Sequence, residues 1–111
     1  MHDKNNRQAQ LLDLVHLRQA FARLAERNGW QVYHTPKNLA AAVAVEAAEL
    51  LEIFQWLSDE QASAITRDIS TKHKVADEVA DVMMYLVELC ARLDIDMVAA
   101  VAQKIHKNEQ R

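Results

Sequence analysis

Three acidic residues, Glu46, Glu49 and Glu52, lie three positions apart in the stretch VEAAELLEIFQW, which is otherwise almost entirely apolar. On a helical wheel of about 100° per residue, Glu46 lies within about 40° of Leu39 and Leu50, inside the apolar stripe. Glu49 lies about 60° to one side of it and Glu52 about 120°. A carboxylate inside an apolar stripe is costly to bury unless a partner compensates its charge. The segment therefore predicts a site for chemistry at Glu46.

A second acidic pair, Glu78 and Asp81, repeats this arrangement in the stretch DEVADVMMYLV. Val82 and Leu89 fall within about 40° of Glu78 on the wheel, and Asp81 lies about 60° to the other side. If the two segments pack together as helices, four carboxylates converge and repel one another unless a cation lies between them. Few basic residues share these faces, so a bound metal is the expected counter-charge. Oxygen-only ligation favours Mg²⁺, with Mn²⁺ as a substitute.

A solvated helix face is the alternative explanation for Glu49, Glu52 and Asp81, which can pair with lysine or arginine along a helix. Both explanations stay open for Glu52. The alternative is weak for Glu46 and Glu78, whose neighbours on the wheel are leucine and valine. A di-iron bundle is disfavoured because it uses Glu-x-x-His motifs, and no histidine follows a glutamate at that spacing.

Long helices must position these acids, and the composition predicts them. The 111 residues include one Gly and one Pro, and half of them are hydrophobic, which is typical of an all-α protein. We expect a single domain over residues 1–111 that forms a bundle of four to five helices, with residues 1–6 frayed. The expected helices span about residues 7–28, 36–57, 59–68, 72–93 and 97–109.

Short polar segments mark the expected helix ends. Gly29 ends the first helix because glycine accepts the left-handed conformation of a C-terminal cap. The expected N-caps are Thr35 before Pro36, Ser58 with Gln61 as a capping box, Ser70 or Thr71, and Asp96.

The charge and apolar pattern argue against several classes of partner. A net charge of −3 with scattered basic residues does not indicate binding to a nucleic-acid polymer. No apolar run approaches the ~20 residues that span a membrane, and the N-terminus lacks a signal core. The lone Cys90 fits a packing role in a reducing compartment. We therefore expect a cytoplasmic protein. The segment 36–57 is apolar or alanine on nearly every side, which predicts a homo-oligomer.

Several motifs together resemble the MazG-like superfamily of all-α nucleoside triphosphate pyrophosphohydrolases. The two acidic pairs match its signature, Glu46-x-x-Glu49 and then Glu78-x-x-Asp81. The strings HTPKNLA, AELLEIFQW, DEVADVMMYLV and KIHKN resemble its dCTP pyrophosphatase branch. The resemblance covers about residues 25–111, which is most of the chain.

The resemblance implies an Mg²⁺-dependent enzyme that cleaves a deoxynucleoside triphosphate, such as dCTP, between its α and β phosphates. The products are a monophosphate and pyrophosphate, and the expected role is the removal of unwanted nucleotides. It also implies a homodimer or homotetramer with sites near subunit contacts. Glu46, Glu49, Glu78 and Asp81 are the expected metal ligands and catalytic residues. One of them, or Glu52, takes the proton of the attacking water, and their spacing does not decide which.

The expected substrate contacts lie on both sides of the acids. Lys104, Asn108 and Arg111 fall within about 60° on one wheel and can bind phosphate, although a solvated C-terminal turn would show the same pattern. The resemblance places His34, Asn38, Trp56 and Tyr85 on the nucleotide side, with Trp30 and Phe54 as further candidates. Lys37 is either a phosphate contact or a surface lysine. A non-catalytic helical oligomer that binds nucleotides or a protein partner is the alternative function, and base preference stays open.

Overall fold

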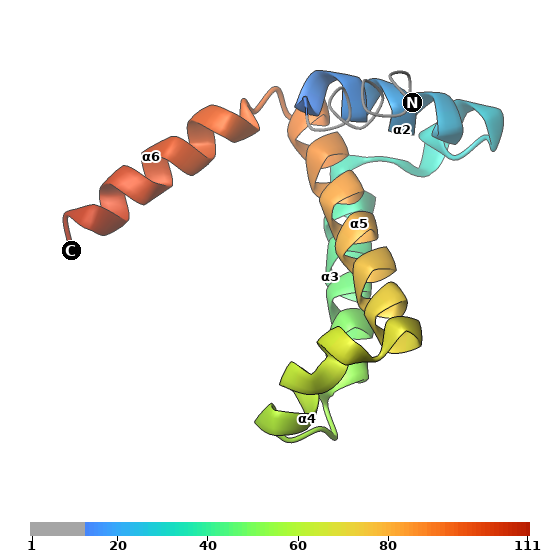
Figure 1. The fold of residues 1–111 in the computed structure, drawn as a ribbon. Coiled ribbons are helices and arrows are strands. Elements are labelled where there is room, and N and C mark those ends of the chain that lie inside the picture. Colours follow the sequence, from blue (N-terminus) through green and yellow to red (C-terminus); the bar gives the residue numbers. More distant parts are fainter. Residues whose placement is uncertain (1–12) are drawn as a thin grey trace, which may run out of the picture.

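Two antiparallel helices, α3 (Pro36–Phe54) and α5 (Ile69–Arg92), lie side by side at the centre of the molecule (Figure 1). The computed structural model describes residues 13–111. Among the described elements, α3 and α5 make the most extensive contacts with each other. Helix α2 (Leu14–Arg27) packs across the end of this pair where α5 ends. The central pair is the scaffold on which both acidic motifs lie.

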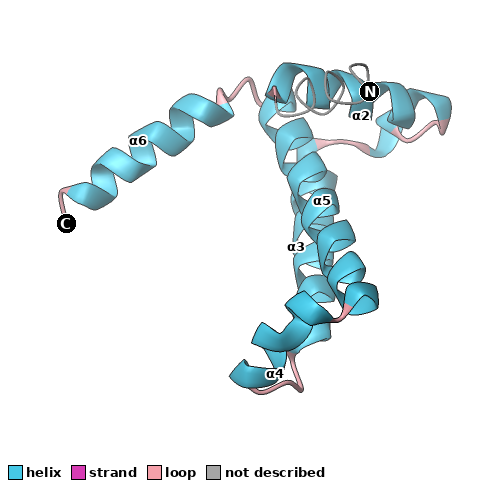
Figure 2. Cartoon of the chain, viewed as in Figure 1, coloured by secondary structure: helices cyan, strands magenta, loops and turns pink. Residues whose placement is uncertain are grey.

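The remaining elements connect or extend this scaffold. A 3₁₀ turn, η1 (Gln31–Tyr33), joins α2 to α3, and the short α4 (Asp59–Ser63) with η2 (Ala64–Arg67) joins α3 to α5. Helix α6 (Met97–Glu109) leads away from the central pair (Figure 1). Within residues 13–111 every regular element is helical (Figure 2), which confirms the all-α prediction.

Most of the predicted helix ends are confirmed by hydrogen bonds. The Thr35 hydroxyl accepts from the Asn38 N–H at 3.2 Å, with Pro36 in the first helical position. Ser58 and Gln61 form both bonds of the capping box, at 3.2 and 2.9 Å. Asp96 caps α6, and Gly29 follows α2 with a φ of 68° in the left-handed region.

Three predicted boundaries are wrong. Asp68, rather than Ser70 or Thr71, caps α5, because its carboxylate accepts from both the Thr71 N–H at 3.2 Å and the Thr71 hydroxyl at 2.7 Å. Helix α3 ends at Phe54 instead of Leu57, since the chain turns there and the Leu57 N–H bonds to the Phe54 carbonyl at 2.9 Å. The third helix stops at Ser63 and continues only as the 3₁₀ turn η2.

The first predicted helix is confirmed over Leu14–Arg27, but the prediction of one unbroken helix from about residue 7 is wrong, because the backbone of Asp13 is extended. Asp13 caps α2, and its side chain accepts from the Val15 N–H at 2.9 Å. The expected helix start near residue 7 and the expected fraying of residues 1–6 lie outside the described part of the chain.

The buried core is small. Among the described residues, the buried hydrophobic side chains are Phe21, Ala25, Leu39 and Val87, at the junction of α2, α3 and α5. The radius of gyration is 16.4 Å, compared with about 13 Å for a compact domain of this length. Cys90 is a free thiol and only half-buried. None of the described helices combines the length and apolarity needed to cross a membrane. Much apolar surface therefore faces outward.

Candidate metal and nucleotide site

Three of the four predicted acids meet between the central helices. Glu46 and Glu49 of α3 and Glu78 of α5 each place a carboxylate oxygen within 4.8 Å of the others. Glu46 and Glu78 are half-buried, whereas Glu49 is exposed. Because α3 and α5 are antiparallel neighbours, residues distant in sequence come together there. Asp81 lies one turn beyond Glu78 on α5, outside this group of three.

The carboxyl groups in this cluster lack compensating charge. The pKa of Glu46 is raised from 4.5 to about 8, first because Glu78 shares a hydrogen bond with it, then because of burial, and then because of Glu49. The Oε2 atoms of Glu46 and Glu78 are buried without a hydrogen-bond partner. Two ionised carboxylates cannot donate to each other, so their contact needs a shared proton or a cation.

Basic side chains do not supply this compensation among the described residues. The ion pairs formed there involve Asp13 and Glu88, and none includes an acid of the cluster. The explanation by a solvated, salt-bridged face therefore does not account for Glu46 and Glu78. Oxygen-only carboxylate ligands with unpartnered oxygens suit a hard divalent cation such as Mg²⁺ or Mn²⁺.

A cavity of about 410 Å³ opens beside the cluster. Its lining combines four acids with one lysine and one isoleucine: Glu49, Glu52, Ile53, Lys74, Asp77 and Glu78. A larger groove of about 670 Å³ lies between α2, the end of α5 and the start of α6. The larger groove contains no metal-binding cluster of described residues. The smaller cavity is therefore the candidate site, because carboxylates that can bind a metal line it.

His34 and Tyr85 form an aromatic wall on the α2 side of the central pair. His34 is 9% exposed, and its ring stacks on Phe21 with centroids 5.5 Å apart and planes 11° apart. Tyr85 meets the His34 ring edge-on at 6.2 Å. Burial and then the charges of Glu46, Asp81 and Glu49 raise the pKa of Tyr85, so the wall lies within the field of the acidic cluster.

Lys37 and Asn38 lie in the first turn of α3, where both side chains are exposed. The Asn38 amide donates to the Tyr33 carbonyl at 2.9 Å and so ties this turn to η1. Lys37 lies nine residues before Glu46, or roughly 13 Å along the helix axis. Lys37 also lies about 180° from Glu46 around the helix axis, so these two residues lie at the His34 end of α3 and Lys37 does not share the face of the cluster.

Other predicted substrate contacts are not brought to the cluster within one chain. Trp56 is 87% exposed in the turn after α3, at the end opposite Lys37. Trp30 is 41% exposed in the segment before α3, and Phe54 is half-buried. The predicted phosphate donors are exposed and lie on or just beyond α6, which leads away from the central pair (Figure 1): Lys104, Asn108 and Arg111.

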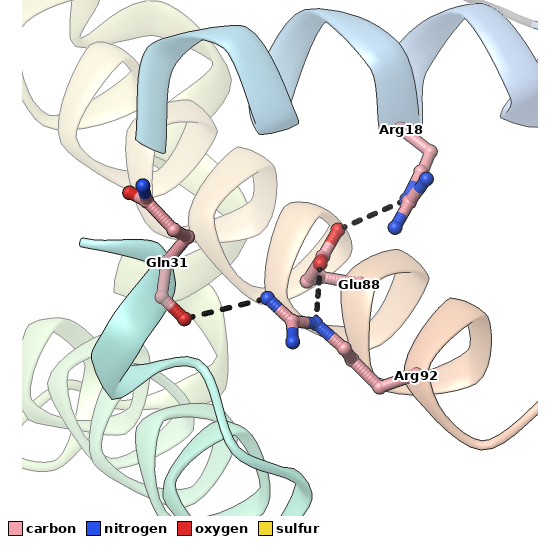
Figure 3. Close-up of polar contacts among 4 residues, drawn as sticks. All are labelled: Arg18, Gln31, Glu88 and Arg92. Atoms are coloured by element: carbon pink, nitrogen blue, oxygen red, sulfur yellow. Dashed lines mark hydrogen bonds and ion pairs between the residues drawn. The ribbon is translucent and has the colours of Figure 1, made fainter. Parts of the chain in front are cut away.

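Sequence reasoning missed a second charged group on α5 (Figure 3). Glu88 is 3% exposed and contacts Arg92 of the same helix and Arg18 of α2. The spacing of Glu88 and Arg92 by four residues was a usable signal. Nothing local in the sequence indicated Arg18, which meets Glu88 only through the packing of α2 on α5.

The fold and the site together define an all-α protein in which two central antiparallel helices hold a carboxylate cluster suited to a divalent cation. Residues 41–111 match the MazG-like family, and the chain belongs to this family. A solved pyrophosphatase from Archaeoglobus fulgidus DSM 4304 is 42% identical, with a TM-score of 0.78 over 88% of this chain and 90% of that one.

Curated relatives include dCTP pyrophosphatase 1 from four mammals. The Rattus norvegicus protein is 36% identical over 98 residues, and the Homo sapiens protein is 34% identical over the same length. Each match covers 88% of this chain but only 58% of the relative. The chain thus spans less than two thirds of the length of these relatives.

Proposed function

We propose that this chain is a metal-dependent nucleoside triphosphate pyrophosphohydrolase. It would cleave a deoxynucleoside triphosphate into the monophosphate and pyrophosphate, and so clear unwanted nucleotides. The first candidate substrate is dCTP or a related nucleotide. The convergence of Glu46, Glu49 and Glu78 from two helices is the observation that carries the proposal. Membership of the MazG-like family and the names of the similar pyrophosphatases support the same activity.

In this proposal the acids hold Mg²⁺, or Mn²⁺ in its place, and Asp81 joins them as a fourth ligand from the next turn of α5. When bound, the cation neutralises carboxylate and phosphate charge and lowers the pKa of water. Basic side chains of the protein bind the triphosphate, and its α-phosphorus lies near the carboxylates. Glu52, which lines the adjoining cavity, is a candidate to accept the proton of the attacking water.

The nucleotide would extend from the carboxylates along the central helices. His34, Asn38 and Tyr85 would contact it at one end of α3. Lys37, as a phosphate contact, and Trp56, as a stacking partner of the base, would reach it only in the assembled oligomer, because one chain does not bring them to the cluster. The aromatic wall supports this placement, because it lies in the field of the same acids. Aromatic faces hold a base by stacking while a few polar groups select it.

Assembly as a homodimer or homotetramer would complete this site. Helix α6 exposes an apolar stripe, Val98, Val101 and Ile105, each at least 54% exposed. Because α6 leads away from its own carboxylates (Figure 1), we place its phosphate donors Lys104, Asn108 and Arg111 beside the acids of another copy. In this view the 111 residues act as one domain in the cytosol, and the single cysteine suits that reducing compartment.

Pyrophosphate release from each deoxynucleoside triphosphate in Mg²⁺ tests the activity. The expected result is turnover that needs the metal, is strongest with a cytosine nucleotide and produces one pyrophosphate for each monophosphate. A panel of modified triphosphates extends the test to other bases. Binding without turnover, in both Mg²⁺ and Mn²⁺, would favour a non-catalytic nucleotide-binding oligomer.

Mixing two inactive variants tests the shared site. Glu49→Gln disables the acids of its own chain, whereas Lys104→Ala removes a phosphate donor. If α6 acts on another copy, refolding the two together rebuilds about a quarter of the sites as fully wild type by random pairing into dimers. Recovery of no activity, with mixed oligomers shown to be present, would place Lys104 in the site of its own chain.

A further inference from the structure

Glu88 is the most deeply buried charged side chain described outside the acidic cluster, at 3% exposure. The Arg92 Nε donates to its Oε1 at 3.0 Å, and the Arg18 Nε lies 3.3 Å from its Oε2 (Figure 3). The Arg18 contact is an ion pair without hydrogen-bond alignment, since the same Oε2 has no hydrogen-bond partner. Two guanidinium groups from two helices thus compensate one buried carboxylate.

Arg92 also reaches beyond its own helix. Its Nη2 donates to the Gln31 carbonyl at 3.4 Å (Figure 3), and the backbone N–H of His34 donates to the same oxygen at 3.2 Å. Glu88 orients the guanidinium so that one edge meets the carboxylate while another meets the turn. This two-sided geometry requires the planar fork of arginine, which the single ammonium of lysine cannot reproduce.

The turn that Arg92 contacts ends at His34. The His34 ring stacks on Phe21, which lies three residues after Arg18 and thus on the same side of α2. The two arginines that contact Glu88 therefore connect it to both rings of this stack. Arg18 belongs to the helix that carries Phe21, and Arg92 contacts the turn that ends at His34. Both rings of the stack also meet Tyr85 edge-on, with centroids 5.8 and 6.2 Å apart, and Tyr85 lies three residues before Glu88 on α5.

We propose that Arg92, oriented by Glu88, is a positioning residue that sets the His34 ring against Tyr85 for nucleotide binding. This inference rests on the proposed function, because the wall acts on a nucleotide only if one binds there. The polar contacts of Arg92 go to Glu88 and to the Gln31 carbonyl, and none goes to Glu46, Glu49 or Glu78. Its effect falls on the affinity for the nucleotide rather than on the chemistry at phosphorus.

Kinetics of Arg92→Met and Arg92→Lys test the proposal. Both variants should raise the KM for dCTP by about 10-fold and leave kcat within about two-fold, because a hydrogen bond from a charged group to the turn is lost. Arg27→Met, at an exposed arginine in the last turn of α2, is the matched control and should leave both constants unchanged. A loss confined to kcat would overturn the proposal.

A double-mutant cycle with His34→Ala separates positioning from general destabilisation. If Arg92 acts through His34, Arg92→Met should add nothing to the KM of the His34→Ala variant. Additive effects in the cycle would mean a purely structural role and would overturn the inference.

The ring protons of His34 give a measurement that needs no turnover. Stacking on Phe21 shifts their NMR resonances, and Arg92→Lys should move them toward the position of an unstacked histidine. If wild-type protein cleaves no nucleotide, the proposed function fails while this measurement still decides the placement of His34. Unchanged His34 resonances in both Arg92 variants would overturn the inference in either case.

Discussion

The carboxyl groups of Glu46 on α3 and Glu78 on α5 contact each other across the central helix pair, and this contact is the main reason that the pKa of Glu46 rises to about 8. The unfolded chain has no such contact, and its Glu46 titrates near 4.5. The folded state therefore holds a proton more tightly than the unfolded state. The raised pKa of Glu46 therefore stabilises the folded protein fully below pH 4.5, and this stabilisation is lost as the pH rises through 8.

Thermal stability without divalent cations should therefore fall as the pH rises from about 5 to 8.5. Scanning fluorimetry in EDTA across this range measures the effect, and Mg²⁺ should raise the Tm more at pH 8 than at pH 6, because it replaces the proton. Glu46→Gln should flatten the pH dependence, since a neutral amide has nothing to titrate. A profile in Glu46→Gln as steep as that of wild type would assign the titration to another group.

Glu49→Gln should abolish most of the metal-dependent activity, with kcat lowered on the order of 100-fold and the fold retained. Glu49 is exposed, so the isosteric amide removes a ligand charge without disturbing the core. Glu109→Gln, an exposed glutamate on α6, is the control for a change of one charge. Full activity in Glu49→Gln would exclude this residue from the site.

Glu52→Gln distinguishes a proton acceptor from a surface acid at the rim of the cavity. If Glu52 accepts the proton, kcat falls by about 10²-fold or more, and the binding of Mn²⁺ stays as in wild type. A surface role predicts wild-type kinetics. Measuring Mn²⁺ binding by electron paramagnetic resonance alongside kcat shows whether any loss comes from metal binding instead.

Gly29→Ala should lower the free energy of unfolding by about 1 kcal/mol. The glycine adopts a φ of 68°, and an added Cβ would meet no atom within 4 Å, so the loss comes from the backbone alone. Gly29→Asn should lose less, because asparagine tolerates the left-handed region better. Urea denaturation of the three proteins checks this order, and an alanine variant as stable as wild type would contradict it.

Val101→Lys should weaken assembly, because it introduces a charge into the exposed apolar stripe of α6. Size-exclusion chromatography with light scattering should show smaller particles for this variant than for wild type. Gln103→Lys changes the same helix at an exposed polar position and serves as the control. Wild-type protein that is monomeric at working concentration would refute the assembly itself.

Local chemistry made much of the fold predictable. Thr35 with Pro36, the Ser58–Gln61 capping box and Asp96 act through hydrogen bonds within four residues, so sequence spacing alone located them. The prediction failed at α5, where Asp68 and Ser70 are rival caps separated by two residues. The Asp68 carboxylate accepts two hydrogen bonds from Thr71. Whether Asp68 or Ser70 caps α5 depends on the path of the chain as it leaves η2.

The sequence by itself determined that the protein is helical and that Glu46 and Glu78 lie on inward faces, because both follow from the periodicity of single helices. Only the tertiary structure decided which groups meet: it clusters three carboxylates, stacks His34 on Phe21, and joins Arg18 to Glu88. It also leads α6 away from the acids of its own chain. Periodicity fixes the direction of a side chain around its own axis, whereas the relative placement of two helices depends on packing between residues distant in sequence.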